Sequence, residues 1–146
     1  MQVKDLEIDD EYITVQDTDT IVEVSKKMKH AGMPDAVVVD SEEKILGALD
    51  AYDIVSKVLA EETNPKEVNA RDIMYTPPIV TPDTPVRRVH EIMRELNVSL
   101  VPVSNNEEKL IGVVTILDVL DGLSIEEARE KSLLGKLRRS LFRRES

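Results

Sequence analysis

Residues 112–118 read Gly-Val-Val-Thr-Ile-Leu-Asp, and residues 47–53, which lie 65 positions earlier, read Gly-Ala-Leu-Asp-Ala-Tyr-Asp. The two stretches share the glycine, the apolar pair after it and the final aspartate. The correspondence extends outward without a gap, so that residues 3–58 align with residues 68–123 and eleven positions are identical. A gap-free tandem repeat indicates two copies of one supersecondary unit that share a core.

Length and composition limit the classes of protein to which the chain can belong. Its 146 residues suffice for a core, and because 41% are hydrophobic but only 3% aromatic, that core is aliphatic. The absence of cysteine excludes disulfides, thiol nucleophiles and thiolate metal sites. No apolar run of about 18 residues and no secretory signal are present, so we expect a cytoplasmic protein.

Charge is distributed unevenly along the chain. Residues 1–130 hold 13 Lys/Arg against 28 Asp/Glu, whereas residues 131–146 hold six Lys/Arg against one Glu. Clustered cations are needed to neutralise phosphates, so the acidic body argues against nucleic acid as a partner.

Each repeat begins with a short strand and an amphipathic helix. In the second copy a β-branched strand is predicted at residues 79–81, and a helix follows with Thr84 as its N-cap and Asn97 at its end. In the first copy Asp19 is the predicted N-cap and Gly32 takes the place of Asn97. Glycine and asparagine both tolerate a positive φ, so the equivalence supports two helices that end in the same way.

The rest of each repeat is predicted as two strands and a second helix. Buried strands are expected at residues 36–39 and 100–103, and return strands, each with an internal glycine, at 45–49 and 110–114. The second helices are expected at 51–60 and 116–120. The predicted fold class is therefore α+β, with two β-α-β-β-α repeats (residues 1–62 and 63–123) related by a pseudo-two-fold axis, and a basic C-terminal helix in residues 124–146.

Thr115 and Asp118 stand at the junction between the return strand and the second helix of the second copy. A hydroxyl at the N-cap and a carboxylate three positions later form a capping box, which is the purely structural interpretation. The same arrangement directs backbone amides, a hydroxyl and the positive end of the helix dipole at one point, which suits a phosphate. Asp118 can also accept hydrogen bonds from the two hydroxyls of a ribose.

The Gly-x-x-Thr-x-x-Asp string, the Val-Pro-Val at residues 101–103 and the tandem arrangement resemble a pair of cystathionine-β-synthase (CBS) domains, also called a Bateman module. The resemblance covers residues 3–123. It implies a sensor that binds AMP, ADP, ATP or S-adenosylmethionine in the cleft between the repeats, with Asp118 on the ribose and Thr115 on the phosphate. The residues that it implies for the adenine pocket are Ile79, Val80, Ser99, Val101 and Pro102.

The first copy departs from this pattern because Asp50 stands where Thr115 stands in the second. A carboxylate about 4 Å from a phosphate costs roughly 4 kcal/mol at an effective dielectric near 20. We therefore expect one competent nucleotide site. The second, weaker site, at Asp50 and Asp53, should be empty or hold an uncharged nucleoside or a cation.

Few cations are available for a polyphosphate. Relatives that bind such ligands often carry His or Arg just before the Val-Pro-Val strand, where this chain has Ser99 in one copy and Pro34 in the other. AMP or an adenosyl compound is therefore favoured over ATP.

No catalytic constellation is evident. His30 and His90 are far apart in sequence, and no P-loop, Ser/His/Asp order or HExxH string is present, so the chain is not expected to be an enzyme and no metal ligands are assigned. The resemblance implies a homodimer, formed through exposed helix faces, that passes a signal to an effector protein. Two alternatives stay open, which are a ligand-free assembly module and a divalent-cation (Mg²⁺) sensor that uses the acidic clefts.

The C-terminal segment is predicted as a separate helix that begins at Ser124, with leucines on one face and Lys/Arg around the rest. The favoured interpretation is a helix packed on the acidic body or on a dimer partner. A basic helix on a membrane surface and a docking peptide for an acidic partner are the alternatives.

Overall fold

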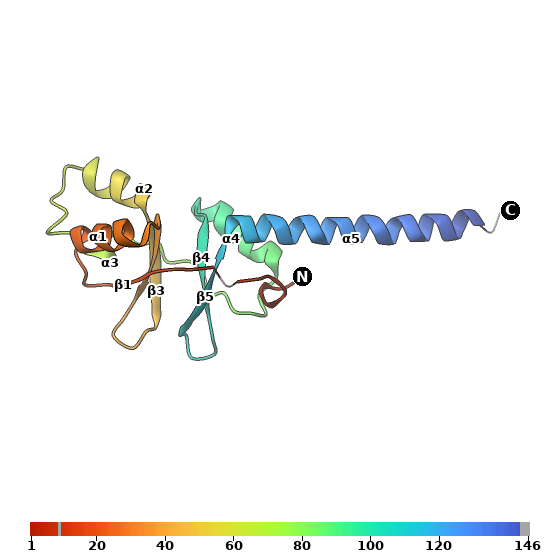
Figure 1. Ribbon diagram of the computed structural model, residues 1–146, viewed down its shortest axis with the longest axis horizontal. Helices are drawn as coiled ribbons and strands as arrows, with labels where there is room; N and C mark the ends of the chain where they lie inside the picture. Colours follow the sequence, from red (N-terminus) through yellow and green to blue (C-terminus); the bar gives the residue numbers. More distant parts are fainter. Residues whose placement is uncertain (9, 144–146) are drawn as a thin grey trace.

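The computed structural model describes residues 1–8 and 10–143, with side chains to residue 141, and contains two β-sheets, each covered by helices (Figure 1). The first repeat contains the three-stranded sheet β1-β2-β3, in which β1 is parallel to β2 and β2 is antiparallel to β3. Its elements are β1 (Thr14–Gln16), α1 (Ile21–Ala31), β2 (Asp35–Val39), β3 (Ile45–Asp50), α2 (Ala51–Ile54) and a π-helical continuation, η2 (Val55–Leu59).

The second repeat follows the same order, but the described residues form no strand equivalent to β1, and one continuous helix takes the place of α2 and η2. Its elements are α4 (Val86–Leu96), β4 (Leu100–Ser104), β5 (Leu110–Thr115) and α5 (Ile116–Arg143). The alternation of strands and helices in two similar units confirms the α+β class.

The strand predicted at residues 79–81 is not formed, although the segment runs beside β4. The carbonyl oxygen of Val80 accepts a hydrogen bond from the Ser104 amide at 2.8 Å. Pro77, Pro78 and Pro82 flank this contact and have no N–H to donate, so a ladder cannot extend in either direction.

The helix starts were predicted one residue too early in the first copy. Thr20, and not Asp19, is the N-cap of α1, and its hydroxyl accepts a hydrogen bond from the Glu23 amide at 3.2 Å. In the second copy Pro85 occupies the N-cap position, and Thr84 instead accepts from the Thr81 amide at 2.9 Å. Both errors arise because neighbouring residues at these positions are all good turn or cap formers.

The helix ends were predicted correctly. Gly32 and Asn97 adopt the left-handed conformation, with φ of 68° and 55°, and their amides donate back to the last turns of α1 and α4. The hairpin turns are also equivalent, because Asp40 and Asn105 each accept two backbone hydrogen bonds through Oδ1. The two repeats therefore have the same conformation even in individual turns.

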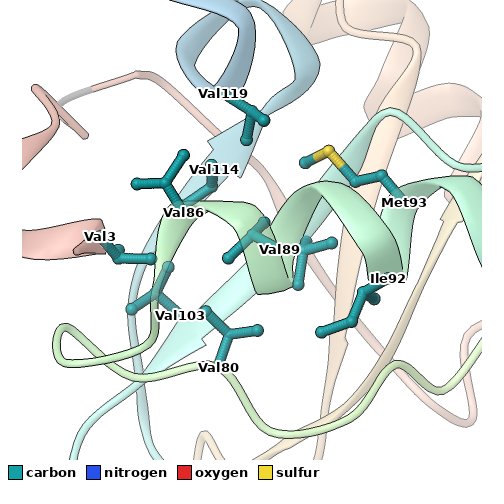
Figure 2. Close-up of a cluster of buried hydrophobic side chains, with 10 residues drawn as sticks. Val3, Val80, Val86, Val89, Ile92, Met93, Val103, Val114 and Val119 are labelled. Atoms are coloured by element: carbon teal, nitrogen blue, oxygen red, sulfur yellow. The ribbon is translucent and has the colours of Figure 1, made fainter. Parts of the chain in front are cut away.

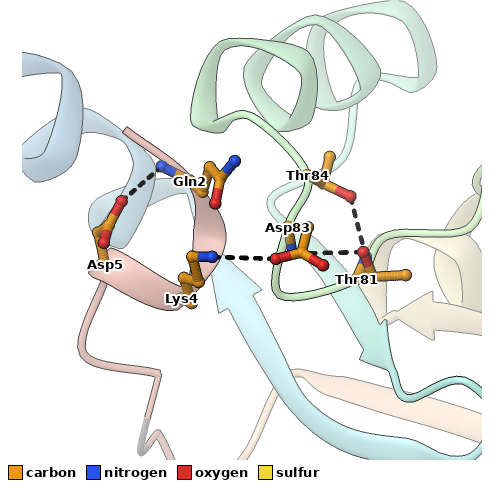
Figure 3. A network of polar contacts seen from close by, with 6 residues as sticks. All are labelled: Gln2, Lys4, Asp5, Thr81, Asp83 and Thr84. Carbon is orange, nitrogen blue, oxygen red and sulfur yellow. Dashed lines mark hydrogen bonds and ion pairs between the residues drawn. The ribbon is translucent and has the colours of Figure 1, made fainter.

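The first helical turn of each repeat packs on the other repeat. The turn η1 (Val3–Asp5) donates from Val3 to the Thr84 carbonyl at 2.9 Å, and Lys4 forms an ion pair with Asp83 at 3.1 Å (Figure 3). The equivalent turn α3 (Ala70–Ile73) donates from Ala70 to the Asp19 carbonyl at 2.9 Å. The two repeats thus exchange their first turns.

Each repeat has its own hydrophobic core, completed by the exchanged turn. Val3 is fully buried among residues of the second repeat (Figure 2), and Ala70 and Ile73 are buried among residues of the first. A third cluster lies at the seam between the sheets and contains Val37, Val39, Ala48, Leu100 and Val113. The expectation of a shared core is confirmed.

The pseudo-two-fold axis passes between the two hairpins. Lys44 forms a β-bridge with Lys109, its own equivalent 65 positions later, and a residue that contacts its equivalent lies beside the axis. Gly47 and Gly112 are also equivalent, and the other repeat's backbone crosses both, although only the crossing at Gly47 requires a residue without a Cβ. A Cβ at Gly47 would collide with the Tyr75 carbonyl oxygen, and a Cβ at Gly112 would lie 3.4 Å from that of Ile8.

Helix α5 differs from the prediction of two separate helices, because it runs without a break for 28 residues. Gly122 does not end it, since a single glycine costs a helix only about 1 kcal/mol. Gly122 instead makes room for the exchanged turn, because a Cβ there would lie 2.6 Å from Leu6 Cδ2 and 3.2 Å from Met1 Sδ. The second half of α5 extends away from the body as a rod (Figure 1).

Candidate functional site

Thr115 lies at one edge of a cavity of about 120 Å³ at the seam between the repeats, which we name the Thr115 pocket. Its other walls come mainly from the first repeat, from the segment before β1 and from the start of β2. The lining residues are Glu11, Tyr12, Ile13, Met33, Pro34, Asp35, Ala36, Val37, Leu100 and Thr115. The pocket is therefore a largely apolar slot that also contains the hydroxyl groups of Tyr12 and Thr115 and two acidic residues, Glu11 and Asp35.

Thr115 and Asp118 form the predicted capping box at the start of α5. The Thr115 amide and hydroxyl donate to Asp118 Oδ2 at 3.1 and 3.0 Å, and the Asp118 amide donates to Thr115 Oγ1 at 3.4 Å. Both side chains are half-buried. The local structural interpretation is thus correct, and the hydroxyl that would meet a phosphate is bonded to its neighbouring carboxylate.

Asp118 is not among the residues that line the Thr115 pocket, and it borders a larger hollow of about 480 Å³ between the start of α5 and the N-terminal segment. Asp5, Glu7, Asp10 and Asp121 line the same hollow, so it is strongly acidic. A cis-diol near Asp118 fits such a place better than an anion does.

The residues predicted for the adenine pocket do not surround Thr115. Ile79, Val80 and Pro102 line a separate cavity of about 150 Å³, opposite Ile45–Gly47 of the first repeat. Val101 is fully buried in the core, and Ser99 is exposed and accepts a hydrogen bond from the Ile116 amide through its carbonyl oxygen at 2.8 Å. The structure therefore does not bring these five residues and Thr115 into one hollow.

The reason lies in the pseudo-two-fold axis, which places the strand starts of one repeat against the helix start of the other. Ile13 and Pro34 stand near Thr115, although the prediction took the adenine wall from the same repeat as Thr115. The equivalents of the predicted adenine-pocket residues, 65 positions earlier in the sequence, lie nearer to Thr115: Pro34, the equivalent of Ser99, lines its pocket. The repeat offset carried that signal, but the sequence did not show which repeat faces which.

The equivalent junction in the first copy is also a capping box, made from two acids. The Asp50 amide donates to Asp53 Oδ2 at 2.9 Å, and the Asp53 amide donates to Asp50 Oδ1 at 2.8 Å. Lys57 forms an ion pair with Asp53 at 3.1 Å and also donates to the Ile73 carbonyl at 2.9 Å. The fold loses nothing by the change from Thr to Asp, as expected for two good N-caps.

Asp35 connects the two junctions, because it lines the Thr115 pocket and pairs in register with Asp50. Burial raises the pKa of Asp35, and the charges of Asp50 and Asp53 raise it further. Burial, followed by the same three carboxylates, also raises the pKa of Tyr75, whose hydroxyl donates to the Leu100 carbonyl at 2.8 Å. Tyr75 is therefore a neutral hydrogen-bond donor at the seam.

The residues described around the Thr115 pocket include no Lys, Arg or His. Within residues 1–8 and 10–143, no three His, Asp or Glu side chains are arranged to hold a metal ion. In the same part of the chain, no helix is both long and apolar enough to cross a bilayer.

Comparison with known proteins places the chain in a family. The sequence model of the CBS domain matches residues 3–60 and 70–130. An uncharacterised protein of Methanopyrus kandleri is 37% identical over 109 residues, which are 74% of this chain and 56% of that protein. The magnesium transporter MgtE of Thermus thermophilus is 30% identical over 131 residues, which are 86% of this chain and 28% of the transporter. The chain thus spans about half or less of these relatives.

Solved structures agree with the sequence comparison. The CBS domain pair of protein MJ0100, in complex with 5′-methylthioadenosine and S-adenosyl-L-methionine, is 26% identical with a TM-score of 0.69, and the match covers 86% of this chain and 98% of that one. The cytosolic domain of MgtE, in complex with ATP, is 27% identical with a TM-score of 0.62, over 75% of this chain and 44% of that one. A CBS domain protein from Pyrobaculum aerophilum shares the fold, with a TM-score of 0.72 at 23% identity over 86% of this chain and 99% of that one. The CBS domain model matches both halves of the chain, and a solved CBS domain pair matches the two halves together. The chain therefore belongs to the CBS domain family, as a tandem pair.

Proposed function

We propose that this chain is a non-catalytic regulatory module that binds one adenosine-containing ligand in the Thr115 pocket. The observation that carries the proposal is that the N-terminus of α5, with its hydroxyl, opens onto an apolar slot formed by the other repeat. An apolar slot suits the faces of a purine, and a helix start suits the polar end of the ligand. The ligands bound by the MJ0100 pair and by the MgtE cytosolic domain support the adenosine class.

Within that class we favour an adenosyl compound or AMP over ATP. Glu11 and Asp35 are the charged residues that line the pocket, and each phosphate charge held near a carboxylate costs free energy. An uncharged thioether or a cationic sulfonium on the ribose carries no such cost. The expected order of affinity is therefore adenosyl compound, then AMP, then ATP.

Helix α5 is the proposed route for the signal. Thr115 precedes its first residue and Asp118 lies in its first turn, so a ligand that engages these groups acts directly on the helix. The same helix holds Glu126, which forms an ion pair with Arg87 of α4, and then continues beyond the body. A ligand that prefers one orientation of α5 would shift the population toward it, by no more than its difference in affinity for the two states.

Calorimetric titration of the purified chain with S-adenosylmethionine, 5′-methylthioadenosine, AMP, ATP and Mg²⁺ tests the proposal. Asp118→Asn should weaken binding of the adenosine compounds at least tenfold. Asp53→Asn is the matched control, because it removes the equivalent capping carboxylate from the first copy. Heat of binding that is lost equally in both variants would contradict the assignment of the site to the second copy.

A ligand-free assembly module is the second candidate. It is favoured by the capping box itself, in which the Thr115 hydroxyl and the Asp118 carboxylate already bond to each other. It is also favoured by exposed apolar side chains on the equivalent helices α2–η2 and α5, namely Tyr52, Val55, Leu59, Leu117 and Leu120. This surface suits a homodimer formed through helix faces. No heat with any adenosine compound would favour this candidate, and heat with Mg²⁺ alone would favour a cation sensor.

The cytoplasmic location, the homodimer and the effector protein stay predictions of the sequence and of the family resemblance.

A further inference from the structure

Tyr75 crosses the seam between the two repeats, in the segment that follows the exchanged turn α3. Its amide donates to the Ala48 carbonyl at 2.8 Å and its carbonyl accepts from the Ala48 amide at 2.9 Å, so its backbone is fixed on β3. Its half-buried ring packs on the cluster at the seam, and its hydroxyl donates to the Leu100 carbonyl at 2.8 Å. The side chain therefore reaches from β3 of the first repeat to β4 of the second.

The repeat offset shows which site this side chain has entered. Asp35, Leu100 and Thr115 line the Thr115 pocket. Their equivalents, 65 positions away, are Leu100, Asp35 and Asp50, so the first-copy counterpart of the pocket lies between these three residues. We name this place the Asp50 site. It is the second, weaker site that the sequence predicts.

The Tyr75 hydroxyl lies within the Asp50 site. It is bonded to the backbone of Leu100, which forms one side of the site. Burial raises the pKa of Tyr75, and the charges of Asp35, Asp50 and Asp53 raise it further. A carboxylate has this effect on a neighbouring group only at short range, so the other sides of the site are also close to the hydroxyl. The side chain thus takes up the space that corresponds to the Thr115 pocket.

The second copy has a different residue at the equivalent position. Asp10 stands 65 positions before Tyr75. It is exposed and lines the acidic hollow beside Asp118, not the Thr115 pocket. The Thr115 pocket keeps a volume of about 120 Å³. The two sites therefore differ in what fills them, and not only in the exchange of Thr115 for Asp50.

A tyrosine side chain shares two properties with an adenine base. Its ring is flat and aromatic, and it carries a hydrogen-bond donor at its far edge, as the exocyclic amine of adenine does. We infer that Tyr75 is the resident occupant of the Asp50 site, where its ring replaces the base and its hydroxyl replaces the amine as donor to Leu100. The chain then holds one adenosine compound, in the Thr115 pocket, and this part of the inference rests on the proposed function.

Occupation by Tyr75 differs from exclusion by charge. The Asp50 carboxylate repels a phosphate but admits an uncharged nucleoside, whereas a filled site excludes both. The compound 5′-methylthioadenosine carries no phosphate and therefore separates the two explanations. If charge alone closed the Asp50 site, two molecules would bind per chain. With Tyr75 in place, one molecule should bind.

Equilibrium dialysis of the full chain with 5′-methylthioadenosine measures this number directly. Wild type should bind one molecule per chain, and Tyr75→Ala should bind one more. Tyr75→Phe is the matched control, because it loses the bond to Leu100 but keeps the ring, and it should bind the same number as wild type. A gain in Tyr75→Phe equal to that in Tyr75→Ala would contradict a role for the ring.

Two further substitutions assign the gained molecule to a repeat. Asp53 and Asp118 are the equivalent capping carboxylates of the two copies. Added to Tyr75→Ala, Asp53→Asn should weaken binding of the gained molecule at least tenfold, whereas Asp118→Asn should leave it unchanged. The reverse result would place the gained molecule in the second copy and overturn the inference.

The melting temperature keeps the test decisive if Tyr75→Ala is poorly folded. Loss of a packed ring lowers the melting temperature, and a molecule that fills the vacated space binds only the folded chain and raises it again. Phenol and 5′-methylthioadenosine should each raise the melting temperature of Tyr75→Ala more than that of Tyr75→Phe. A rise with phenol alone would reveal a cavity that does not accept a nucleoside, and a rise with neither would show that Tyr75 fills no such space.

The outcomes separate this inference from the proposed function. A wild-type chain that binds none, together with a Tyr75→Ala variant that binds one, would remove the Thr115 pocket as a nucleoside site but support the role of Tyr75. Two molecules on wild type, or no gain in a folded Tyr75→Ala, would overturn the role of Tyr75 and leave the Thr115 pocket in place.

Discussion

The Thr115 hydroxyl donates to the Asp118 carboxylate at 3.0 Å, whereas their equivalents, Asp50 and Asp53, are joined only through backbone amides. Two carboxylates cannot donate to each other, so the second copy alone has a hydroxyl proton at this point. That proton is available for a ligand oxygen if the Thr115 side chain rotates. The chemical asymmetry between the two copies is therefore concentrated in one atom.

Thr115→Asp converts the second junction into a copy of the first. The N-cap is retained, so the melting temperature should change by no more than a few degrees. AMP affinity should fall at least tenfold, because a carboxylate then faces the phosphate, while 5′-methylthioadenosine should lose less. Calorimetry with both ligands checks the difference. Equal losses for the two ligands would show that charge is not the reason.

Asp35→Asn tests the electrostatics of the seam. The pKa of Asp35 is raised in the folded chain, so the folded state holds its proton more tightly than the unfolded state does. The contribution of Asp35 to the free energy of unfolding is therefore fully present at low pH. It is lost as the pH rises from the ordinary pKa of an aspartate, about 4, through the raised pKa of Asp35 in the folded chain. Asp35→Asn should stabilise the chain at pH 7 and have little effect at pH 3. Denaturant unfolding at both values measures this, and equal effects at both would contradict it.

Gly47→Ala and Gly112→Ala form a matched pair across the pseudo-two-fold axis. A Cβ at Gly47 collides with the Tyr75 carbonyl oxygen, so the strand or the crossing segment must shift, and we expect a loss of about 1–3 kcal/mol. At Gly112 the nearest atom would be 3.4 Å away, which is an ordinary contact, and the loss should stay below about 1 kcal/mol. Chemical denaturation of both variants gives the comparison. A larger loss at Gly112 would show that the two crossings are not arranged as described.

Gly122→Ala and Gly135→Ala compare two glycines within α5. Gly135 has no heavy atom within 4 Å of a built Cβ, so alanine should stabilise the helix by about 0.5–1 kcal/mol. Gly122 faces Leu6 Cδ2 at 2.6 Å, so the same gain in helix propensity should be offset by displacement of the exchanged turn. Amide hydrogen exchange at Val3 should rise in Gly122→Ala and stay unchanged in Gly135→Ala. A rise in both variants would refute the packing of the N-terminal segment on Gly122.

Local features of the fold were predictable because they depend on neighbouring residues. The left-handed ends at Gly32 and Asn97 follow from residue type, and the capping box at Thr115 and Asp118 follows from spacing. The strand expected at residues 79–81 was wrong, because the prolines on either side of it lack the N–H groups that a ladder needs.

Features that depend on how the repeats face each other were not predictable from local pattern. The exchange of first turns pairs residues about 80 positions apart, such as Val3 and Thr84. The wall around Thr115 comes from Ile13 and Pro34 for the same reason. The continuity of α5 was missed because Ser124 was taken as the start of a separate helix, although the helix runs through it from Ile116 to Arg143.

The exchanged turns bear on how such a chain arises. A half-length protein with one repeat would lack part of its own interior as a monomer, and two such molecules would complete each other by donating their turns reciprocally, as in a domain-swapped dimer. Joining the two halves in one polypeptide makes that assembly intramolecular, at an effective concentration of roughly millimolar or more. The tandem gene product then folds without having to find a partner, and its two halves become free to diverge, one of them keeping a threonine where the other has an acid.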